Sequence, residues 1–145
     1  VQDVSCIVMG GHGPTMVPIT RTASVGGVPL TDLLSQEKID SIVTRVQEAG
    51  TELVKLYGKG SAFFSPAAAI AEMIEAYLKD KKRLIPSAAY CEGEYGINGY
   101  FIGVPAIIGS DGVEKIIEIS LTKNEIEQLE KTLQQVKVTV LETGL

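Results

Sequence analysis

A short apolar run that stops at a group of glycines constrains the fold of this chain more than any other feature. The run Val4 to Met9 is short and rich in β-branched residues, which is typical of a buried strand. Three glycines follow at once, and they surround His12, the only histidine among the 145 residues. Glycine permits a left-handed backbone or the close approach of another group. The sequence therefore predicts a rigid strand that ends in a tight turn carrying one imidazole.

The spacing of these residues alone does not determine whether the turn takes part in chemistry. The pKa of an imidazole lies near neutrality, so His12 suits proton transfer, but a turn that merely contains a histidine fits the spacing equally well. The chain has no G-x-S-x-G elbow, and its glycines lack the G-x-G-x-x-G spacing and the following helix of a dinucleotide loop. One histidine and two distant cysteines cannot form a structural zinc site, so no metal centre is expected. A nucleophilic Cys91 paired with His12 is an alternative to a general acid/base role.

Composition narrows the class of protein. A chain of 145 residues with 45% hydrophobic and 21% charged residues is typical of one globular domain. The net charge of −5 provides no basic surface for nucleic acid, and no segment approaches the roughly 20 apolar residues of a membrane span. We therefore expect a cytoplasmic protein that binds neither nucleic acid nor membrane. Cys6 and Cys91 are interpreted as buried thiols rather than a disulfide.

Three helices are predicted from capping signals and apolar periodicity. Ser35 can cap a helix that continues past Gly50 toward residue 57. Ser65 can cap a second helix, with Pro66 at its first position, whose stripe should be buried: Ile70, Met73, Ile74, Tyr77 and Leu78. The segment 122–125, Thr-Lys-Asn-Glu, has the spacing of a capping box at the start of a third helix.

In the rest of the chain, apolar and polar residues follow the pattern of β-strands. Strands are expected at 17–25, 83–92, 100–109 and 113–119, with a hairpin turn at Ser110-Asp111-Gly112. Antiparallel hairpins beside long helices, in place of alternating βαβ units, predict an α+β fold.

Several segments together resemble a known family. The stretch 8–18 is similar to the active-site segment of NAD-dependent malate dehydrogenases of the lactate/malate dehydrogenase family, and the likeness spans essentially the whole chain. The segments that carry the resemblance are 8–18 (VMGGHGPTMVP), 24–30 (SVGGVPL), 58–69 (GKGSAFFSPAAA) and 93–97 (GEYGI). The Ser-Pro-Ala-Ala-Ala form at 65–69 looks more like the bacterial, lactate-dehydrogenase-like malate dehydrogenases than like the lactate enzymes.

The resemblance implies that the chain is only the C-terminal, substrate-binding and catalytic domain, spanning residues 1–145. An N-terminal Rossmann domain that binds NAD would precede it, and would supply the substrate-binding arginines and the aspartate that orients the histidine. The chain begins with Val1, which agrees with a fragment. As an isolated domain it should be inactive. A homo-oligomer is expected, as is a small 2-hydroxy or 2-keto dicarboxylic acid as substrate.

The resemblance also assigns roles to individual residues. His12 matches the proton acceptor, which takes the hydroxyl proton of malate as oxaloacetate forms. Gly60, Ser61 and Ala62 would shape the substrate pocket, and Ser65 and Pro66 would lie near the nicotinamide. The family usually has aspartate where this chain has Pro14, so hydrogen bonding in the turn should differ locally. A lactate dehydrogenase of the same family and a non-catalytic binding or assembly module are the alternatives.

Overall fold

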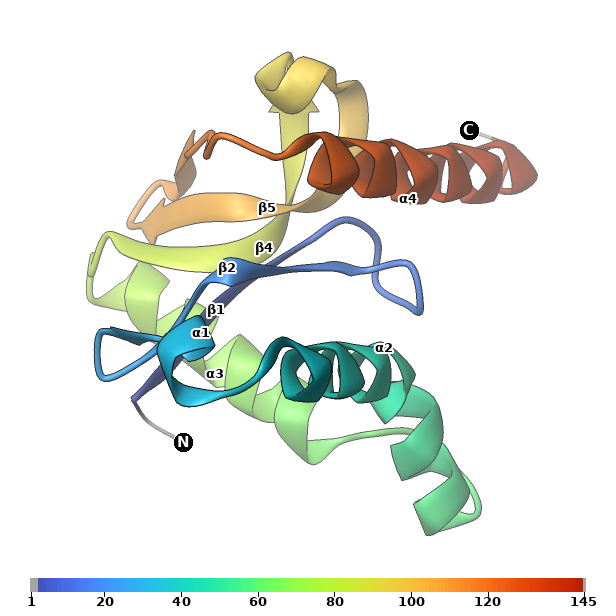
Figure 1. Cartoon of the computed structure of the whole chain (residues 1–145). Helices are drawn as coiled ribbons and strands as arrows, with labels where there is room; N and C mark the ends of the chain where they lie inside the picture. Colours follow the sequence, from blue (N-terminus) through green and yellow to red (C-terminus); the bar gives the residue numbers. More distant parts are fainter. Residues whose placement is uncertain (1–2, 145) are drawn as a thin grey trace.

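The computed structural model describes residues 3–144 (Figure 1). Its strands form two three-stranded antiparallel sheets, with the orders β1-β2-β3 and β4-β5-β6. The first sheet contains β1 (Val4–Met9), β2 (Val17–Val25) and β3 (Val28–Pro29). The second contains β4 (Arg83–Glu92), β5 (Asn98–Gly109) and β6 (Gly112–Ile116). The predicted α+β class is confirmed.

The helices cover the strands from two sides. They are α1 (Leu30–Leu33), α2 (Gln36–Tyr57), α3 (Phe64–Leu78) and α4 (Lys123–Glu142), with a 3₁₀ turn η1 (Glu94–Gly96) between β4 and β5. Figure 1 shows α4 on one side of the strands and α2 with α3 on the other. No helix within residues 3–144 has the length and apolar content that crossing a bilayer requires.

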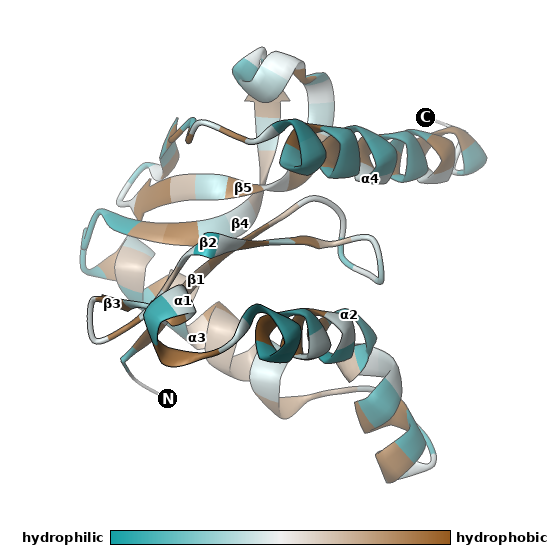
Figure 2. Cartoon of the chain, in the orientation of Figure 1, coloured by the Kyte–Doolittle hydropathy of each residue, from teal (hydrophilic) through white to brown (hydrophobic). Residues whose placement is uncertain are grey.

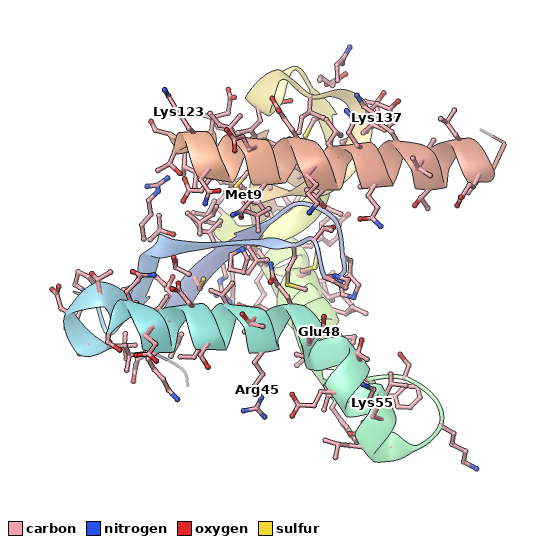
Figure 3. The ribbon with its side chains drawn as sticks, turned by 45° about the vertical axis from the view of Figure 1, so that its right-hand side comes forward. Met9, Arg45, Glu48, Lys55, Lys123 and Lys137 are labelled. Carbon is pink, nitrogen blue, oxygen red and sulfur yellow. The ribbon has the colours of Figure 1, made fainter. Side chains whose placement is uncertain are left out.

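The core lies where the two sheets meet α4. Its buried side chains come from both sheets, the segment before β5, and α4: Met9, Val17, Ile19, Ala89, Cys91, Ile97, Ile102, Val104, Ala106 and Leu129. Met9, the last residue of β1, is only 1% exposed and lies in the middle of the molecule beneath α4 (Figure 3). The strand that carries the histidine turn therefore ends inside the core, so the start of the turn is fixed by packing.

Two of the three predicted helix starts are confirmed. The hydroxyl of Ser35 accepts a hydrogen bond from Lys38 N at 3.4 Å, and α2 runs through Gly50 without a break. Thr122 and Glu125 form the complete capping box of α4. The start predicted for α3 was wrong, because the helix begins at Phe64, two residues before Pro66. Proline is tolerated there because the first four N–H groups of a helix have no intrahelical partner.

The predicted burial of the α3 stripe was also wrong. Exposure reaches 55% for Ile70, 51% for Ile74 and 73% for Leu78, and α3 buries only Ala76 against the rest of the molecule. Figure 2 shows the pale-brown, mainly apolar surface of this helix. The pattern identified an apolar face correctly, but nothing within the described chain covers it. Cys6, expected to be buried, is likewise exposed, because the first half of β1 lies at the edge of its sheet.

The last predicted strand is shorter than expected. Pairing of β6 stops at Ile116, whereas the periodicity extended to residue 119. Beyond Ile116 the backbone turns to the side chain of Tyr95, whose hydroxyl donates to Ile117 O at 2.8 Å and accepts from Ile119 N at 2.9 Å. A side chain thus satisfies groups that a strand partner would otherwise bind.

Candidate active site

The histidine turn joins β1 to β2 and is held first by a backbone bridge. Gly10 N donates to Gly103 O at 2.9 Å, and Gly103 N donates to Gly10 O at 2.8 Å. Gly103 belongs to β5, so this bridge ties the end of β1 to the second sheet. The residue two positions before His12 is therefore fixed to both sheets.

Both bridge positions require glycine. Gly10 has a φ of +91°, and a Cβ there would lie 2.6 Å from Thr132 Cγ2. A Cβ on Gly103 would lie 2.6 Å from Gly10 O, a distance that real Cβ contacts do not show. The glycines therefore allow the strand end, the partner strand and α4 to approach more closely than any other residue would permit.

Two helices hold the turn on opposite sides of His12. Gly11 N donates to Thr132 Oγ1 of α4 at 2.8 Å, and the same oxygen lies 3.1 Å from Thr15 Oγ1. From α2, Gln47 Nε2 donates to Met16 O at 3.0 Å. The turn is thus fastened to both helical layers.

Pro14 fits the turn that it occupies. Met16 N donates to Gly13 O at 2.9 Å, which makes residues 13–16 a hydrogen-bonded turn with Pro14 at its second position. Proline is favoured there because its fixed φ matches the turn and its missing N–H is not needed. The altered hydrogen bonding expected from this residue is therefore accommodated by the turn itself.

His12 is exposed and lies where three cavities meet. The largest, of about 720 Å³, is formed by the turn, the second half of α2 and the start of α3. A second, of about 380 Å³, lies between the turn and α4, and a third, of about 270 Å³, lies against β4 and β5. A side chain on a fixed backbone that reaches several cavities can meet a ligand in any of them.

The structure brings most of the predicted site residues together. Ser61, Ala62, Ser65 and Pro66 line the 720 Å³ cavity with His12, and Lys55 adds a positive charge to that lining. Gly60 does not line it; its φ is +90°, and it lies beside the Phe63 ring. Their position near His12 agrees with the predicted roles in substrate and nicotinamide binding, which stay predictions.

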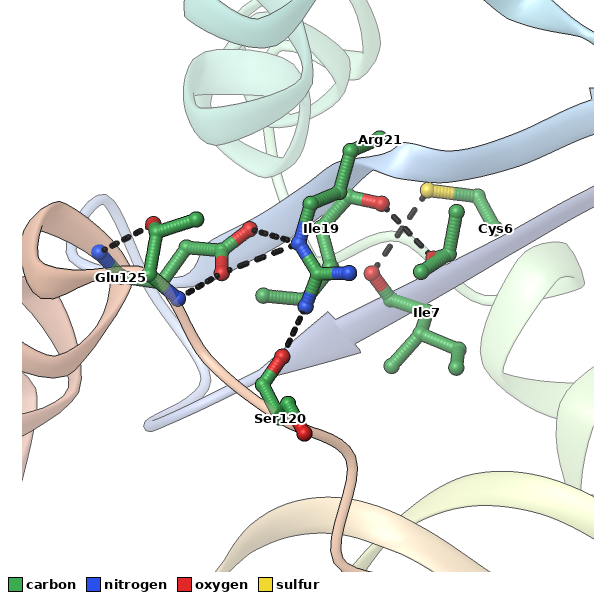
Figure 4. A network of polar contacts seen from close by, with 8 residues as sticks. Cys6, Ile7, Ile19, Arg21, Ser120 and Glu125 are labelled. Carbon is green, nitrogen blue, oxygen red and sulfur yellow. Dashed lines mark hydrogen bonds and ion pairs between the residues drawn. The ribbon is translucent and has the colours of Figure 1, made fainter.

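The partners that a catalytic histidine needs do not come from the described part of the chain. Over residues 3–144, no aspartate or glutamate lines any of the three cavities. The three arginines pair with glutamates elsewhere: Arg21 with Glu125 at 3.0 Å, Arg45 with Glu52 at 2.9 Å, and Arg83 with Glu72 at 2.6 Å. Figure 4 shows Arg21 between Glu125 and the carbonyl of Ser120, and Figure 3 shows Arg45 pointing away from the strands.

The alternative nucleophile is disfavoured by its surroundings. Cys91 is fully buried in the core, and burial, together with the carboxylates of Glu94 and Glu118, raises the pKa of its thiol to about 11. The thiolate is the nucleophilic form, so the raised pKa of Cys91 keeps it protonated and unreactive at neutral pH. Cys91 also lines none of the cavities that His12 reaches.

Besides Gly103, two residues that hold the turn were missed by sequence reasoning. Gln47 looks like an ordinary polar residue of an amphipathic helix, and nothing in the sequence indicates its contact with Met16. Thr132 carries a weak signal, because it follows Leu129 by three residues and so puts a hydroxyl on the apolar stripe of α4. It is fully buried, and a buried hydroxyl needs a hydrogen-bond partner.

A further cavity, of about 750 Å³, lies apart from His12 between α4 and η1. Its lining mixes apolar residues, such as Leu121, Ile126 and Leu133, with the charged Glu127, Glu130 and Lys131. No cysteine or histidine lines it within the described residues, so its size alone does not make it the centre of chemistry.

Comparison with known proteins defines the class to which this fold and turn belong. Residues 1–143 match the α/β C-terminal domain of the lactate/malate dehydrogenase family, and the chain belongs to that family. Among its relatives is a malate dehydrogenase of Rhodopirellula baltica, 53% identical over 140 residues, which are 97% of this chain and 44% of that protein.

Solved structures give the same class. The malate dehydrogenase of Salinibacter ruber superposes with a TM-score of 0.95 at 47% identity, covering 99% of this chain and 47% of that one. A lactate dehydrogenase of Cryptosporidium parvum, solved with lactic acid and nicotinamide adenine dinucleotide, gives 0.91 at 46% identity, covering 97% of this chain and 47% of that one. The chain thus spans about half the length of its relatives.

Proposed function

We propose that this chain is the catalytic C-terminal half of an NAD-dependent malate dehydrogenase, with His12 as the proton acceptor. The observation that carries the proposal is the placement of His12, exposed on an anchored turn and sharing one cavity with Ser61, Ala62, Ser65 and Pro66. The identity of 53% to a malate dehydrogenase supports the choice of substrate. An N-terminal Rossmann domain would complete the protein.

The chemistry follows from what His12 can do. Neutral imidazole takes the hydroxyl proton of malate as the carbinol carbon is oxidised to the ketone of oxaloacetate, and it returns this proton in the reverse direction. A carboxylate that orients the ring and arginines that bind the substrate carboxylates would come from the preceding domain, since within residues 3–144 no aspartate, glutamate or arginine lines these cavities. Gly60, Ser61 and Ala62 would limit the substrate pocket by their shape.

The start of α3 fits the nicotinamide end of NAD. Ser65, Pro66 and the alanines that follow are small and exposed, so they leave room for a flat ring beside His12. When bound, NAD accepts the hydride that leaves the carbinol carbon. The chain has no glycine-rich dinucleotide loop, so the preceding domain would hold most of the cofactor.

The test compares variants of the full-length protein. With malate and NAD, measured by the absorbance of NADH, His12→Ala should lower kcat about 10²- to 10⁴-fold, because proton transfer by a positioned side chain contributes that much. Lys38→Ala, an exposed change in the first turn of α2, is the control and should keep the wild-type rate. Near-normal turnover of His12→Ala would refute the role of His12.

The same assay separates the alternatives. Lactate in place of malate tests the hypothesis of a lactate dehydrogenase. A higher kcat/KM with lactate than with malate would overturn the proposed substrate. A full-length protein inactive with both substrates would favour a binding or assembly module. The isolated 145-residue chain should show no turnover, because half a site cannot hold the reacting atoms in place.

The exposed apolar surface of α3 supports an interface with another part or another copy of the same protein. Ile70, Ile74, Tyr77 and Leu78 of α3 are about half or more exposed, and contiguous apolar surface of this kind marks interaction sites. The preceding domain and a second copy of the protein are the proposed covers. Light scattering should show a dimer or tetramer of the full-length protein, and a monomer would contradict the proposed oligomer. A cytoplasmic location stays a prediction.

A further inference from the structure

We propose that Thr132 of α4 is a positioning residue that sets the place of the His12 imidazole through the backbone on both sides of it. This inference rests on the proposed role of His12 as proton acceptor. Thr132 Oγ1 accepts from Gly11 N at 2.8 Å and lies in hydrogen-bond contact with Thr15 Oγ1 at 3.1 Å. Gly11 precedes the histidine directly and Thr15 follows it by three residues, so one hydroxyl holds both flanks.

The hydroxyl of Thr132 is shielded from solvent and already engaged on both sides. Thr132 is fully buried, so no bulk water reaches its oxygen. Its two lone pairs and one proton suffice to accept from Gly11 N–H and to donate to, or accept from, Thr15. Removing the oxygen would leave the Gly11 N–H without its partner, and a backbone donor in that position moves until it finds another.

The methyl group of the same side chain packs closely against the adjacent backbone. Thr132 Cγ2 lies only 2.6 Å from the position where a Cβ would stand on Gly10. Gly11 approaches almost as closely, because its Cβ position would lie 3.0 Å from Thr132 Oγ1. The backbone just before His12 therefore lies directly on this side chain, held by one hydrogen bond and by steric fit.

Thr132 is itself on a rigid support. Leu129, three residues earlier on α4, is buried in the core, and Thr122 and Glu125 cap the start of the helix. The core thus determines the position of the hydroxyl, and the hydroxyl in turn determines the position of the turn that it binds. Because proton transfer depends steeply on the geometry of the two heavy atoms, a shift of the turn should lower turnover more than substrate binding.

The test uses the full-length protein and the pair Thr132→Ser and Thr132→Ala. Both variants lose the methyl group, and they differ only in the oxygen. We expect Thr132→Ala to lower kcat for malate about 10- to 100-fold with KM changed less than about 3-fold, and Thr132→Ser to stay within about 3-fold of wild type in kcat. The matched control is Thr44→Ser and Thr44→Ala on α2, where the exposed hydroxyl only donates to Asp40 O of its own helix.

Hydrogen exchange measures the anchor without reference to catalysis. Peptides covering residues 10–16 should exchange faster in Thr132→Ala than in Thr132→Ser, while peptides from α2 should not differ. If Thr132→Ala does not fold, Thr132→Val removes the same oxygen at nearly constant volume and is compared with wild type, which keeps the methyl group, instead of with Thr132→Ser. Equal kcat and equal exchange in the oxygen-free variant and the protein with which it is compared would overturn the inference. A wild-type protein without dehydrogenase activity would refute the proposed function instead, and the exchange comparison would still decide whether Thr132 holds the turn.

Discussion

Replacing Gly103 by alanine should destabilise the chain by about 3 kcal/mol or more. The new Cβ would stand 2.6 Å from Gly10 O, a backbone atom that cannot move without breaking the bridge between β1 and β5. Loss of the two hydrogen bonds of that bridge costs about 1 kcal/mol each, and overpacking at such a site adds about 1–3 kcal/mol. The φ of Gly103 lies outside the left-handed region, so the cost comes from the contact and not from backbone strain.

The matched control is Gly50→Ala, the same chemical change within α2. No atom lies within 4 Å of a Cβ at Gly50, and alanine is favoured over glycine inside a helix by roughly 0.5–1 kcal/mol. Urea unfolding of the 145-residue chain, followed by circular dichroism, should therefore shift in opposite directions for the two variants. A free energy of unfolding for Gly103→Ala within about 0.5 kcal/mol of wild type would refute the idea that the close approach of β1 and β5 holds the two sheets together.

Three further predictions concern the capping box and the thiols. Thr122→Ala should lower the free energy of unfolding by about 1 kcal/mol, measured in urea, because the Glu125 N–H loses its acceptor. Burial raises the pKa of Glu125, but hydrogen bonds from Thr122 N–H and Arg21 outweigh it and hold this pKa below its ordinary value of 4.5. The charged carboxylate therefore stabilises the fold above pH 4.5 and stops doing so as the pH falls through the lowered pKa, so wild type and Glu125→Gln should converge in urea midpoint at acid pH. With a thiol reagent at pH 8, the exposed Cys6 of the 145-residue chain should react in the native state and Cys91 only after unfolding, and Cys6→Ser should abolish the fast reaction.

The two helix starts that sequence reasoning located correctly are set by local chemistry. Ser35 and Thr122 act on donors three residues away, so their caps depend on nothing distant. The strand predicted at 113–119 was too long for the opposite reason. Its last residues bind the hydroxyl of Tyr95, which lies more than twenty residues earlier in the sequence. The start of α3 failed because proline is compatible with the whole first turn of a helix and does not fix its first residue.

The candidate site divides in the same way. His12 was identifiable because one histidine among glycines is a local pattern, and the resemblance to a family then gave it a role. The contacts that hold it were not identifiable, because Gly103, Thr132 and Gln47 come from three separate elements and meet only in the folded chain. One strand and two helices contribute these contacts, and no sequence pattern relates them.

The contacts around His12 are of one kind only, because they hold its backbone and leave its ring without a charged partner among the described residues. Gly103, Thr132 and Gln47 hold the turn that carries the imidazole, whereas within residues 3–144 no carboxylate or arginine lines the cavities that the imidazole reaches. The 720 Å³ cavity is built from α2 and α3, and the exposed apolar face of α3 continues away from it. Covering that face removes apolar surface from water, which is favourable by about 25 cal/mol per Å² before the costs of association. Under the proposed function, the preceding domain would therefore have two tasks, covering part of this apolar face and bringing charged partners to His12.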